Sequence, residues 1–362
     1  MNSLPALLVL EDGRSFLGRS FGAEGEAFGE LVFSTGMSGY QETLTDPSYR
    51  GQVVLATAPH IGNTGWNDED DESARIQVAG YVVRDPAPRP SNWRSRRSLD
   101  AELADQGIVG ICDIDTRALT RHIRSLGAMR VGISTRELNP DRLRARVLEQ
   151  PVMAGADLCG EVSTPKARIV PAVGERRFTV AAVDLGIKGM TPAQMAGRGM
   201  EVHVLPASTS FEEIAALEPD GVFFSNGPGD PDMCNDAVEI IRKQMNRSKK
   251  PICGICMGNQ LLSKAAGATI YKLKYGHRGH NQPVRMVGTE KCYITSQNHG
   301  YAVDASTLDK DWRELFVNMN DGSNEGICHK ENPWFTSQFH PEACSGPVDT
   351  YFMFDKFVET LK

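Results

Sequence analysis

The stretch Pro251-Ile252-Cys253-Gly254-Ile255-Cys256-Met257-Gly258-Asn259-Gln260 joins an apolar segment typical of a buried strand to the helical pattern of residues 261–266. Within it, Gly254, Cys256 and Gly258 form the Gly-x-Cys-x-Gly pattern of a nucleophile elbow. An elbow strains the backbone of its central residue, and flanking glycines carry no Cβ atoms to clash with it. We therefore expect Cys256 to lie exposed at the end of a sheet, beside a helix N-terminus that favours its thiolate.

The same stretch contains Cys253-x-x-Cys256, a spacing also found in redox motifs and in half of a zinc site. The chain offers no second Cys pair or Cys/His pair at a spacing that would complete a metal site. We expect no metal here, and we interpret Cys253 as a small buried hydrophobic residue on the strand.

Composition bounds the class of protein. A chain of 362 residues with 40% hydrophobic residues can bury substantial cores and is expected to form two domains. Its net charge of −7 argues against a nucleic-acid partner, which would need clustered basic residues. Eight irregularly spaced cysteines fit reduced thiols, and the sequence contains neither a signal peptide nor a membrane-spanning run. These features predict a cytoplasmic protein without membrane contact.

The first half reads as a β-rich α+β domain with a few helices. Asp12-Gly13 between apolar runs predicts a β-hairpin, and Asp115 is placed to cap a helix over the following residues. Residues 164–177 hold two prolines and four basic residues with little apolar periodicity, as linkers do. We expect an N-terminal domain over residues 1–150, a linker over 151–177 and a second domain over 178–362.

Two charged stretches of the first half allow more than one interpretation. Residues 67–72 are rich in acidic side chains and could form a cation loop, although a solvated acidic turn is favoured because calcium loops need alternating oxygen ligands and a defined glycine. Residues 89–97 carry four arginines around Trp93, which could contact an anion. An exposed loop or a partner contact is the favoured reading in an acidic protein.

From Phe178 onward, apolar strand patterns alternate with helical patterns as far as the elbow. Such a βαβ series predicts an open, mostly parallel sheet of flavodoxin-like type with helices on both faces and ligands at the carboxyl ends of its strands. One such end carries Ser225-Asn226-Gly227-Pro228-Gly229-Asp230-Pro231. Backbone N–H groups of this turn could stabilise an oxyanion, or the segment could be an ordinary tight turn.

Near the C-terminus, His340 and Glu342 are two residues apart. In an extended segment, residues i and i+2 point to the same face, so these side chains can lie together. A carboxylate fixes the tautomer of a neighbouring imidazole and raises its basicity, which suits a base that accepts a thiol proton. Cys256, His340 and Glu342 would then form a thiol triad.

These three motifs together resemble the class I (triad) glutamine amidotransferases. Over nearly its whole length the chain resembles one family of them, the small, glutamine-hydrolysing chains of carbamoyl-phosphate synthase. Narrower marks of that family occur at residues 276–283, 296–304 and 324–327, and in the first half at residues 8–13, 39–42, 45–49, 59–63 and 113–117.

The resemblance implies roles for individual residues. Cys256 would be the nucleophile, His340 its base and Glu342 the residue that orients His340. Main-chain groups of Gly229 and Met257 are candidates for the oxyanion hole. The residues implied to hold glutamine are Ser48, Gly227, Gly229, Met257, Gln260, Asn298, Gly300 and Tyr301. Asn259 stands where many members of the family carry His, so a ring contribution from that position is not expected.

The resemblance further implies a large partner chain, in a heterodimer or a higher assembly. That chain would receive the ammonia and use ATP and Mg²⁺ to make carbamoyl phosphate for arginine and pyrimidine synthesis. This chain would need no cofactor, and it contains no Gly-x-x-x-x-Gly-Lys-Ser/Thr phosphate loop.

Three other functions remain as alternatives. The chain could serve another synthase, such as those for anthranilate or GMP, or act as a γ-glutamyl hydrolase, but those enzymes do not resemble residues 1–150. It could be a non-catalytic interaction subunit, which the intact triad disfavours. It could also be a glutaminase without a partner.

Overall fold

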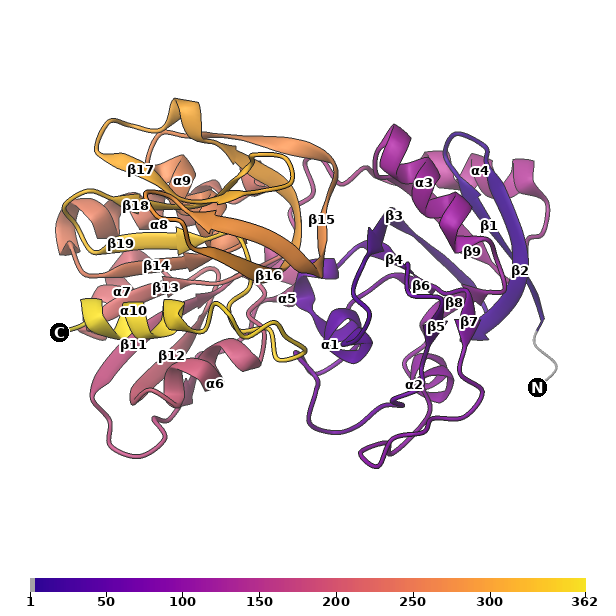
Figure 1. Cartoon of the computed structure of the whole chain (residues 1–362), viewed down its shortest axis with the longest axis horizontal. Coiled ribbons are helices and arrows are strands. Elements are labelled where there is room, and N and C mark those ends of the chain that lie inside the picture. The colour runs from indigo at the N-terminus through magenta and orange to yellow at the C-terminus, as the bar shows by residue number, and fades with distance from the viewer. Residues whose placement is uncertain (1–3) are drawn as a thin grey trace. The chain divides into compact units, whose positions relative to one another are not determined.

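The computed structural model describes residues 4–362, which divide into two compact units (Figure 1). The first unit runs to Ala156 and includes Lys274–Arg278; the second comprises Asp157–Leu273 and Gly279–Lys362. The division falls inside the segment 151–177 that the sequence predicts as a linker.

The first unit is a closed barrel in the strand order β1-β2-β8-β6-β4-β3-β9. Its strands are β1 Pro5–Leu10, β2 Ser15–Gly22, β3 Glu26–Ser34, β4 Gln52–Ala56, β6 Gly80–Val82, β8 Val109–Cys112 and β9 Met129–Ser134. A separate pair is formed by β5 His60–Ile61 and β7 Asp85–Pro86, and the helices are α1 Tyr40–Thr45, the 3₁₀ turn η1 Pro47–Tyr49, α2 Leu99–Asp105, α3 Thr116–Leu126 and α4 Pro140–Glu149.

Successive Cβ atoms of a strand point in opposite directions, so alternate side chains of each strand lie on opposite sides of the barrel wall. Leu8 and Leu10 of β1 join a cluster to which six of the barrel strands contribute, whereas Leu7 and Val9 pack against Leu143 of α4. The predicted hairpin forms, with Val9 opposite Ser15. The Asp115 carboxylate accepts a hydrogen bond from the Ala118 N–H, so the predicted helix cap is also confirmed.

The acidic turn and the arginine-rich loop of the first unit meet each other. Arg94 binds Asp70 at 2.6 Å, and Arg97 binds Asp68 at 2.9 Å and also pairs with Glu102. The acidic side chains and the arginines thus neutralise each other. The ion pairs therefore support neither a cation-binding loop nor an anion-binding site. Sequence reasoning treated the two stretches separately because nothing in their spacing indicates that they are neighbours.

The second unit is built on one sheet in the order β10-β12-β11-β13-β14-β19-β18-β17-β15-β16. Its strands are β10 Arg168–Val170, β11 Phe178–Asp184, β12 Met200–Pro206, β13 Gly221–Phe224, β14 Ile252–Ile255, β15 Thr269–Met286, β16 Cys292–Asp304, β17 Trp312–Asn318, β18 Asn324–His329 and β19 Trp334–Ser337. Its helices and helical turns are α5 Cys159–Val162, α6 Met190–Ala196, α7 Phe211–Ala216, η2 Pro231–Met233, α8 Asn235–Lys243, η3 Gln244–Ser248, α9 Met257–Ala265, η4 Ala305–Thr307 and α10 Phe352–Thr360.

Strand β11 shows how the sheet buries both faces. Val180 and Ala182 face a cluster that includes α6 and α10, while Ala181 and Val183 face one that includes α7, α8 and α9. Helices therefore cover both faces, as predicted, and Figure 1 shows α10 and α9 on opposite sides of the strands. Strands β12, β11, β13, β14 and β19 are parallel, which brings their carboxyl ends to one edge.

The sheet extends beyond the predicted parallel part on both sides. At one edge, β10 pairs antiparallel with β12, so part of the predicted linker is a strand of the second unit. At the other, β18 pairs antiparallel with β19, and β17 pairs antiparallel with β18. The sheet is therefore mixed, with a parallel centre. None of the helices within residues 4–362 combines the length and apolar character that crossing a membrane requires.

Candidate active site

Cys256 lies at the turn between β14 and α9, at the carboxyl edge of the parallel strands. Its backbone has φ 54° and ψ −100°, a strained conformation for a residue with a side chain. The turn is held by hydrogen bonds from the Cys256 N–H to the Ser337 carbonyl at 2.8 Å and from the Gly258 N–H to the Ser225 carbonyl at 3.0 Å. The predicted strand, turn and helix are thus all present.

The two glycines of the elbow are required by close backbone approach. A Cβ on Gly258 would lie 2.1 Å from the Phe224 carbonyl oxygen, and one on Gly254 would lie 2.6 Å from the carbonyl oxygen of Gly258. Both contacts are with backbone atoms, which cannot rotate away. The glycines allow the start of α9 to approach strand β13, and this approach sets the position of the thiol.

The Cys256 side chain is 3% exposed, so the expectation of an exposed thiol is wrong for this structure. Its Sγ donates to the Asn298 carbonyl of β16 at 3.6 Å, so a residue of this strand lies against the thiol. Cys253 is buried in the core on the preceding strand, where burial raises the pKa of its thiol. Its predicted structural role is confirmed.

His340 and Glu342 lie together, with Nδ1 of His340 2.6 Å from Oε1 of Glu342. Both are fully buried, and the His340 N–H donates to the Ser296 carbonyl at 2.8 Å. The pairing agrees with the prediction, but its geometry does not come from a strand. β19 ends at Ser337, and Pro341 and Glu342 form a turn that brings the carboxylate back to the ring.

Lys188 is a member of this cluster that sequence reasoning missed. It follows β11, is buried, and places Nζ 3.2 Å from the same Oε1 of Glu342. The Lys188 backbone N–H is 3.4 Å from Oδ1 of Asn226, which ties this loop to the glycine turn. No motif contains Lys188, and its 154-residue separation from Glu342 gives no spacing signal.

The charges of the cluster determine its protonation. Burial opposes the charge on Glu342, but Lys188 and His340 outweigh it and lower the pKa of this carboxyl to about 2. Burial also opposes charge on His340, but Glu342 raises the pKa of this imidazole to about 10. Within residues 4–362, Nε2 of His340 makes no hydrogen bond of ordinary length and angle. The neighbouring Cys256 nevertheless contributes to the raised pKa of the imidazole. At neutral pH His340 is therefore an imidazolium and Glu342 a carboxylate.

The glycine turn after β13 is fixed against the loop that carries Lys188. Oγ of Ser225 accepts a hydrogen bond from the Leu185 N–H at 2.9 Å, and Nδ2 of Asn226 donates to the Gly186 carbonyl at 2.8 Å. A Cβ on Gly227 would lie 2.1 Å from the Leu185 carbonyl oxygen. Gly229 has φ 93°, a conformation that favours glycine. The turn is therefore rigid, as an anion-binding turn must be.

The residues predicted to hold glutamine are divided between the units. Met257 and Gln260 begin α9 beside the nucleophile, and Asn298, Gly300 and Tyr301 lie on β16. Nε2 of Gln260 donates to the Tyr301 carbonyl at 3.1 Å, which connects the two elements. Ser48 lies in η1 of the first unit, so its part in a glutamine site stays a prediction.

Asn259 is fully buried, and its amide is engaged inside the second unit. Its Nδ2 donates to Oε1 of Gln338 at 2.9 Å, and its Oδ1 accepts from Oγ1 of Thr336 at 2.6 Å. Both partners follow or belong to β19. The amide thus braces α9 against that strand.

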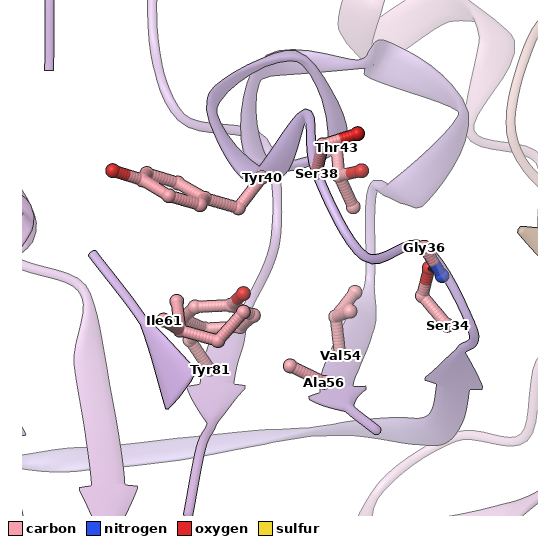
Figure 2. A pocket seen from close by; sticks show the side chains of 9 residues that line it. All are labelled: Ser34, Gly36, Ser38, Tyr40, Thr43, Val54, Ala56, Ile61 and Tyr81. Carbon is pink, nitrogen blue, oxygen red and sulfur yellow. Dashed lines mark hydrogen bonds between the residues drawn. The ribbon is translucent and has the colours of Figure 1, made fainter. Parts of the chain in front are cut away.

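Two other groupings were compared with this cluster. The first unit has a cavity of about 20 Å³ between Tyr40, Ile61 and Tyr81 (Figure 2). That volume holds about one water molecule, so it cannot hold glutamine.

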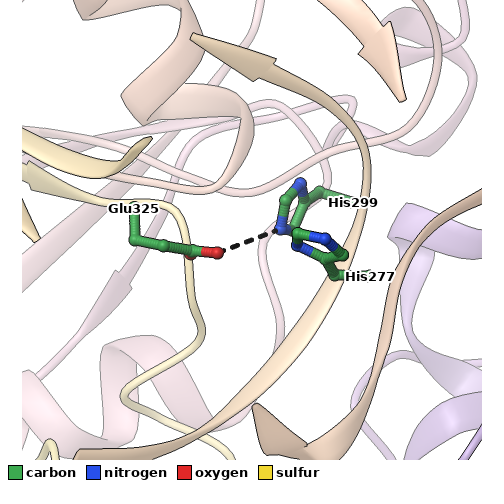
Figure 3. Close-up of side chains that lie close together, drawn as sticks. All are labelled: His277, His299 and Glu325. Carbon is green, nitrogen blue, oxygen red and sulfur yellow. Dashed lines mark ion pairs between the residues drawn. The ribbon is translucent and has the colours of Figure 1, made fainter. Parts of the chain in front are cut away.

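In the second unit, Nε2 of His299 lies 3.9 Å from Oε1 of Glu325 (Figure 3). The His299 ring nitrogens also contact the Tyr301 carbonyl and the Gln297 amide, so the ring is occupied by protein partners.

This chain is similar to known proteins over nearly its whole length. The family model for the carbamoyl-phosphate synthase small chain CPSase domain matches residues 8–133, and that for class-I glutamine amidotransferases matches residues 181–360. The chain is 58% identical to the carbamoyl phosphate synthase small chain of Streptomyces avermitilis, over 99% of this chain and 96% of that one. It is 53% identical to the small chain of Mycobacterium tuberculosis H37Rv, over 98% of each. A glutamine amidotransferase structure from Thermotoga maritima shares 20% identity over 46% of this chain and 76% of that one, with a TM-score of 0.38.

Proposed function

Because this chain belongs to the carbamoyl-phosphate synthase small chain family and is its glutamine-hydrolysing subunit, we propose that Cys256, His340 and Glu342 carry out the hydrolysis. The observation that carries this assignment is the single buried cluster formed by an elbow cysteine, an imidazole and a carboxylate. The imidazolium of His340 stabilises the Cys256 thiolate, and Glu342 holds the ring through Nδ1, which leaves Nε2 for proton transfer.

The thiolate attacks the side-chain amide carbon of glutamine, and negative charge develops on the amide oxygen. Met257 is the first residue of α9, so its N–H has no acceptor within the helix. Together with the Gly229 N–H of the rigid turn, it would stabilise that oxyanion. His340 then gives its proton to the leaving nitrogen, and ammonia departs.

Water hydrolyses the resulting glutamyl thioester, with neutral His340 accepting a proton from the water. Glutamate leaves and the thiolate–imidazolium pair is restored. In this proposal glutamine is held by Gln260, Asn298, Gly300 and Tyr301 around the elbow, by Gly227, Gly229 and Met257 through their main chains, and by Ser48 of the first unit.

The ammonia passes to a large partner chain, which uses ATP and Mg²⁺ to join it to bicarbonate. The small-chain names of the relatives support such a partner, in a heterodimer or a higher assembly of heterodimers. No cofactor is assigned to this chain, and we expect it to work in the cytoplasm.

The test is glutamate release from glutamine by the wild type, Cys256→Ser and the matched control Cys253→Ser. Each protein is assayed alone and with the cognate large chain, ATP and bicarbonate, and carbamoyl phosphate is followed in the same reactions. We expect Cys256→Ser to lose at least about 10³-fold in kcat, as removal of a nucleophile does. Cys253→Ser should retain activity, since that residue is on the strand behind the elbow.

Each failure identifies the assumption that is wrong. Full activity in Cys256→Ser would refute the assigned nucleophile. Hydrolysis that depends on Cys256 but yields no carbamoyl phosphate with the large chain would refute the proposed transfer of ammonia to that partner.

A further inference from the structure

Two cysteines outside the triad lie side by side in the second unit. Sγ of Cys159, the first residue of α5, is 3.6 Å from Sγ of Cys234, which precedes α8. Both thiols are free in this structure. Their separation in sequence is 75 residues, and no motif connects them. The pair therefore requires an explanation separate from glutamine hydrolysis.

The pair touches the turn that carries the proposed oxyanion donor. Sγ of Cys159 lies 3.4 Å from the carbonyl oxygen of Pro228, to which the thiol donates. Pro228 lies between Gly227, which packs closely against Leu185, and Gly229. A change at the Cys159 sulfur therefore acts on the turn directly.

The two thiols differ in exposure, as do the reactive cysteine that meets an oxidant and the resolving cysteine that then forms the disulfide with it. Cys159 is buried at 4% exposure, whereas Cys234 is partly exposed and lies at the N-terminus of the nine-residue helix α8. The contact with Cys159 lowers the pKa of Cys234, and Lys264 lowers it further. The same contact raises the pKa of Cys159. Cys234 is thus the thiol that an oxidant can reach, and Cys159 lies buried behind it.

We propose that Cys159 and Cys234 form a reversible dithiol–disulfide site, and that its oxidation draws Cys159 away from Pro228 and disturbs the glycine turn. A disulfide needs the sulfurs to close from 3.6 Å to about 2.0 Å, a movement within reach of side-chain rotation. The bond replaces the S–H group that donates to Pro228.

The chemistry balances with a peroxide as the oxidant. The Cys234 thiolate attacks one peroxide oxygen, becomes a sulfenic acid and releases hydroxide, which takes up a proton to become water. The Cys159 thiol then attacks the Cys234 sulfur and expels a second water, so one S–S bond replaces two S–H bonds. A dithiol reductant reverses the change by exchange.

The consequence for activity rests on the proposed role of Gly229. A lost oxyanion donor costs about 10²–10³ in rate, and a displaced one should cost less, so we expect kcat for glutamine hydrolysis to fall about tenfold. The formation of the disulfide itself does not depend on that role.

The test treats the full chain with diamide, a diazene that takes two hydrogens from a pair of thiols and becomes a hydrazine. Samples of the wild type, Cys234→Ser and the control Cys292→Ser are alkylated and digested without reduction, and peptides are identified by mass. Cys292 is an exposed cysteine on β16. Glutamate release is measured before treatment, after it, and after dithiothreitol.

We expect a Cys159–Cys234 linked peptide in the wild type and in Cys292→Ser, with the fall in kcat reversed by dithiothreitol, and neither effect in Cys234→Ser. Absence of the linked peptide would overturn the site. A linked peptide with unchanged kcat, or an equal fall in Cys234→Ser, would overturn its connection to the turn. If the reduced wild type lacks glutaminase activity, the proposed catalytic function fails, while the linked peptide still tests the thiol site.

Discussion

The carboxylate of Glu342 serves two cations, the imidazolium of His340 and the ammonium of Lys188, and both contacts end on the same oxygen. His340 and Glu342 could be predicted from the sequence because they are two residues apart beside a proline. Lys188 could not, since its approach depends on the packing of β11 and β19 within one sheet. The charges on these three side chains therefore depend on one another.

Replacing Lys188 with Met should leave Glu342 with one cation instead of two. Removing one partner of a buried ion pair costs about 3–5 kcal/mol, and because His340 remains we expect the lower end of that range. Urea unfolding measures the change, and exposed Lys166→Met is the control, with an expected effect within about 0.5 kcal/mol. Equal stability of the wild type and Lys188→Met would show that the ion pair contributes nothing.

Acid unfolding gives the sign of the Glu342 contribution. The pKa of Glu342 is lowered to about 2 from an ordinary value of 4.5, so its stabilisation is present above pH 4.5 and is lost as the pH falls through 2. In Lys188→Met the pKa of this carboxyl rises, and circular dichroism should show acid unfolding at a higher pH than in the wild type. An unchanged midpoint would contradict the assigned cause of the shift.

The pH above which the kcat for glutamine hydrolysis falls should depend on Glu342. Burial lowers the pKa of His340, but Glu342 raises it to about 10, so the proton given to ammonia remains available until the pH approaches 10. The same protonation stabilises the fold fully below pH 6.5 and is lost through pH 10. In Glu342→Gln, kcat against pH should begin to fall nearer pH 6.5. If kcat began to fall at the same pH in both proteins, Glu342 would not be the residue that raises the pKa of His340.

At the scale of elements, the strand–turn–helix unit β14–Cys256–α9 was predictable because glycine spacing encodes close approach locally. The burial of the thiol was not, since Asn298 on β16, which contacts the thiol, is 42 residues away along the chain. The edge strand β10 was likewise hidden in a segment of prolines and basic residues that reads as a linker. Periodicity identifies elements better than it identifies their neighbours.

Gly258→Ala tests the close approach of the elbow to β13. The added Cβ would lie 2.1 Å from the Phe224 carbonyl oxygen, so the start of α9 must move and carry Cys256 with it. We expect kcat for glutamine hydrolysis to fall at least about 100-fold, because misplacement by 1 Å can cost that much. Gly197→Ala is the control, since its nearest atom would be 3.5 Å away and its φ is −60°. Comparable activity in both variants would refute the steric argument.

At the scale of the whole molecule, the sequence predicted a β-rich α+β first domain and an α/β second domain, and both are found. It did not predict that the first sheet closes into a barrel, because closure depends on pairings such as β1 with β9, across more than a hundred residues. Nor did it predict that Lys274–Arg278 group with the first unit. Long-range pairings of this kind have no spacing rule from which they could be inferred.

The proposed hydrolysis of glutamine requires that Cys256 become acylated. Wild-type protein mixed with glutamine, quenched in acid within the first turnover and digested, can be examined by mass spectrometry for a covalent adduct. We expect the peptide that contains Cys256 to gain one glutamyl group, and fragmentation to locate it on Cys256 and not on Cys253. Release of glutamate without any adduct on Cys256, or with the adduct on another residue, would contradict the mechanism.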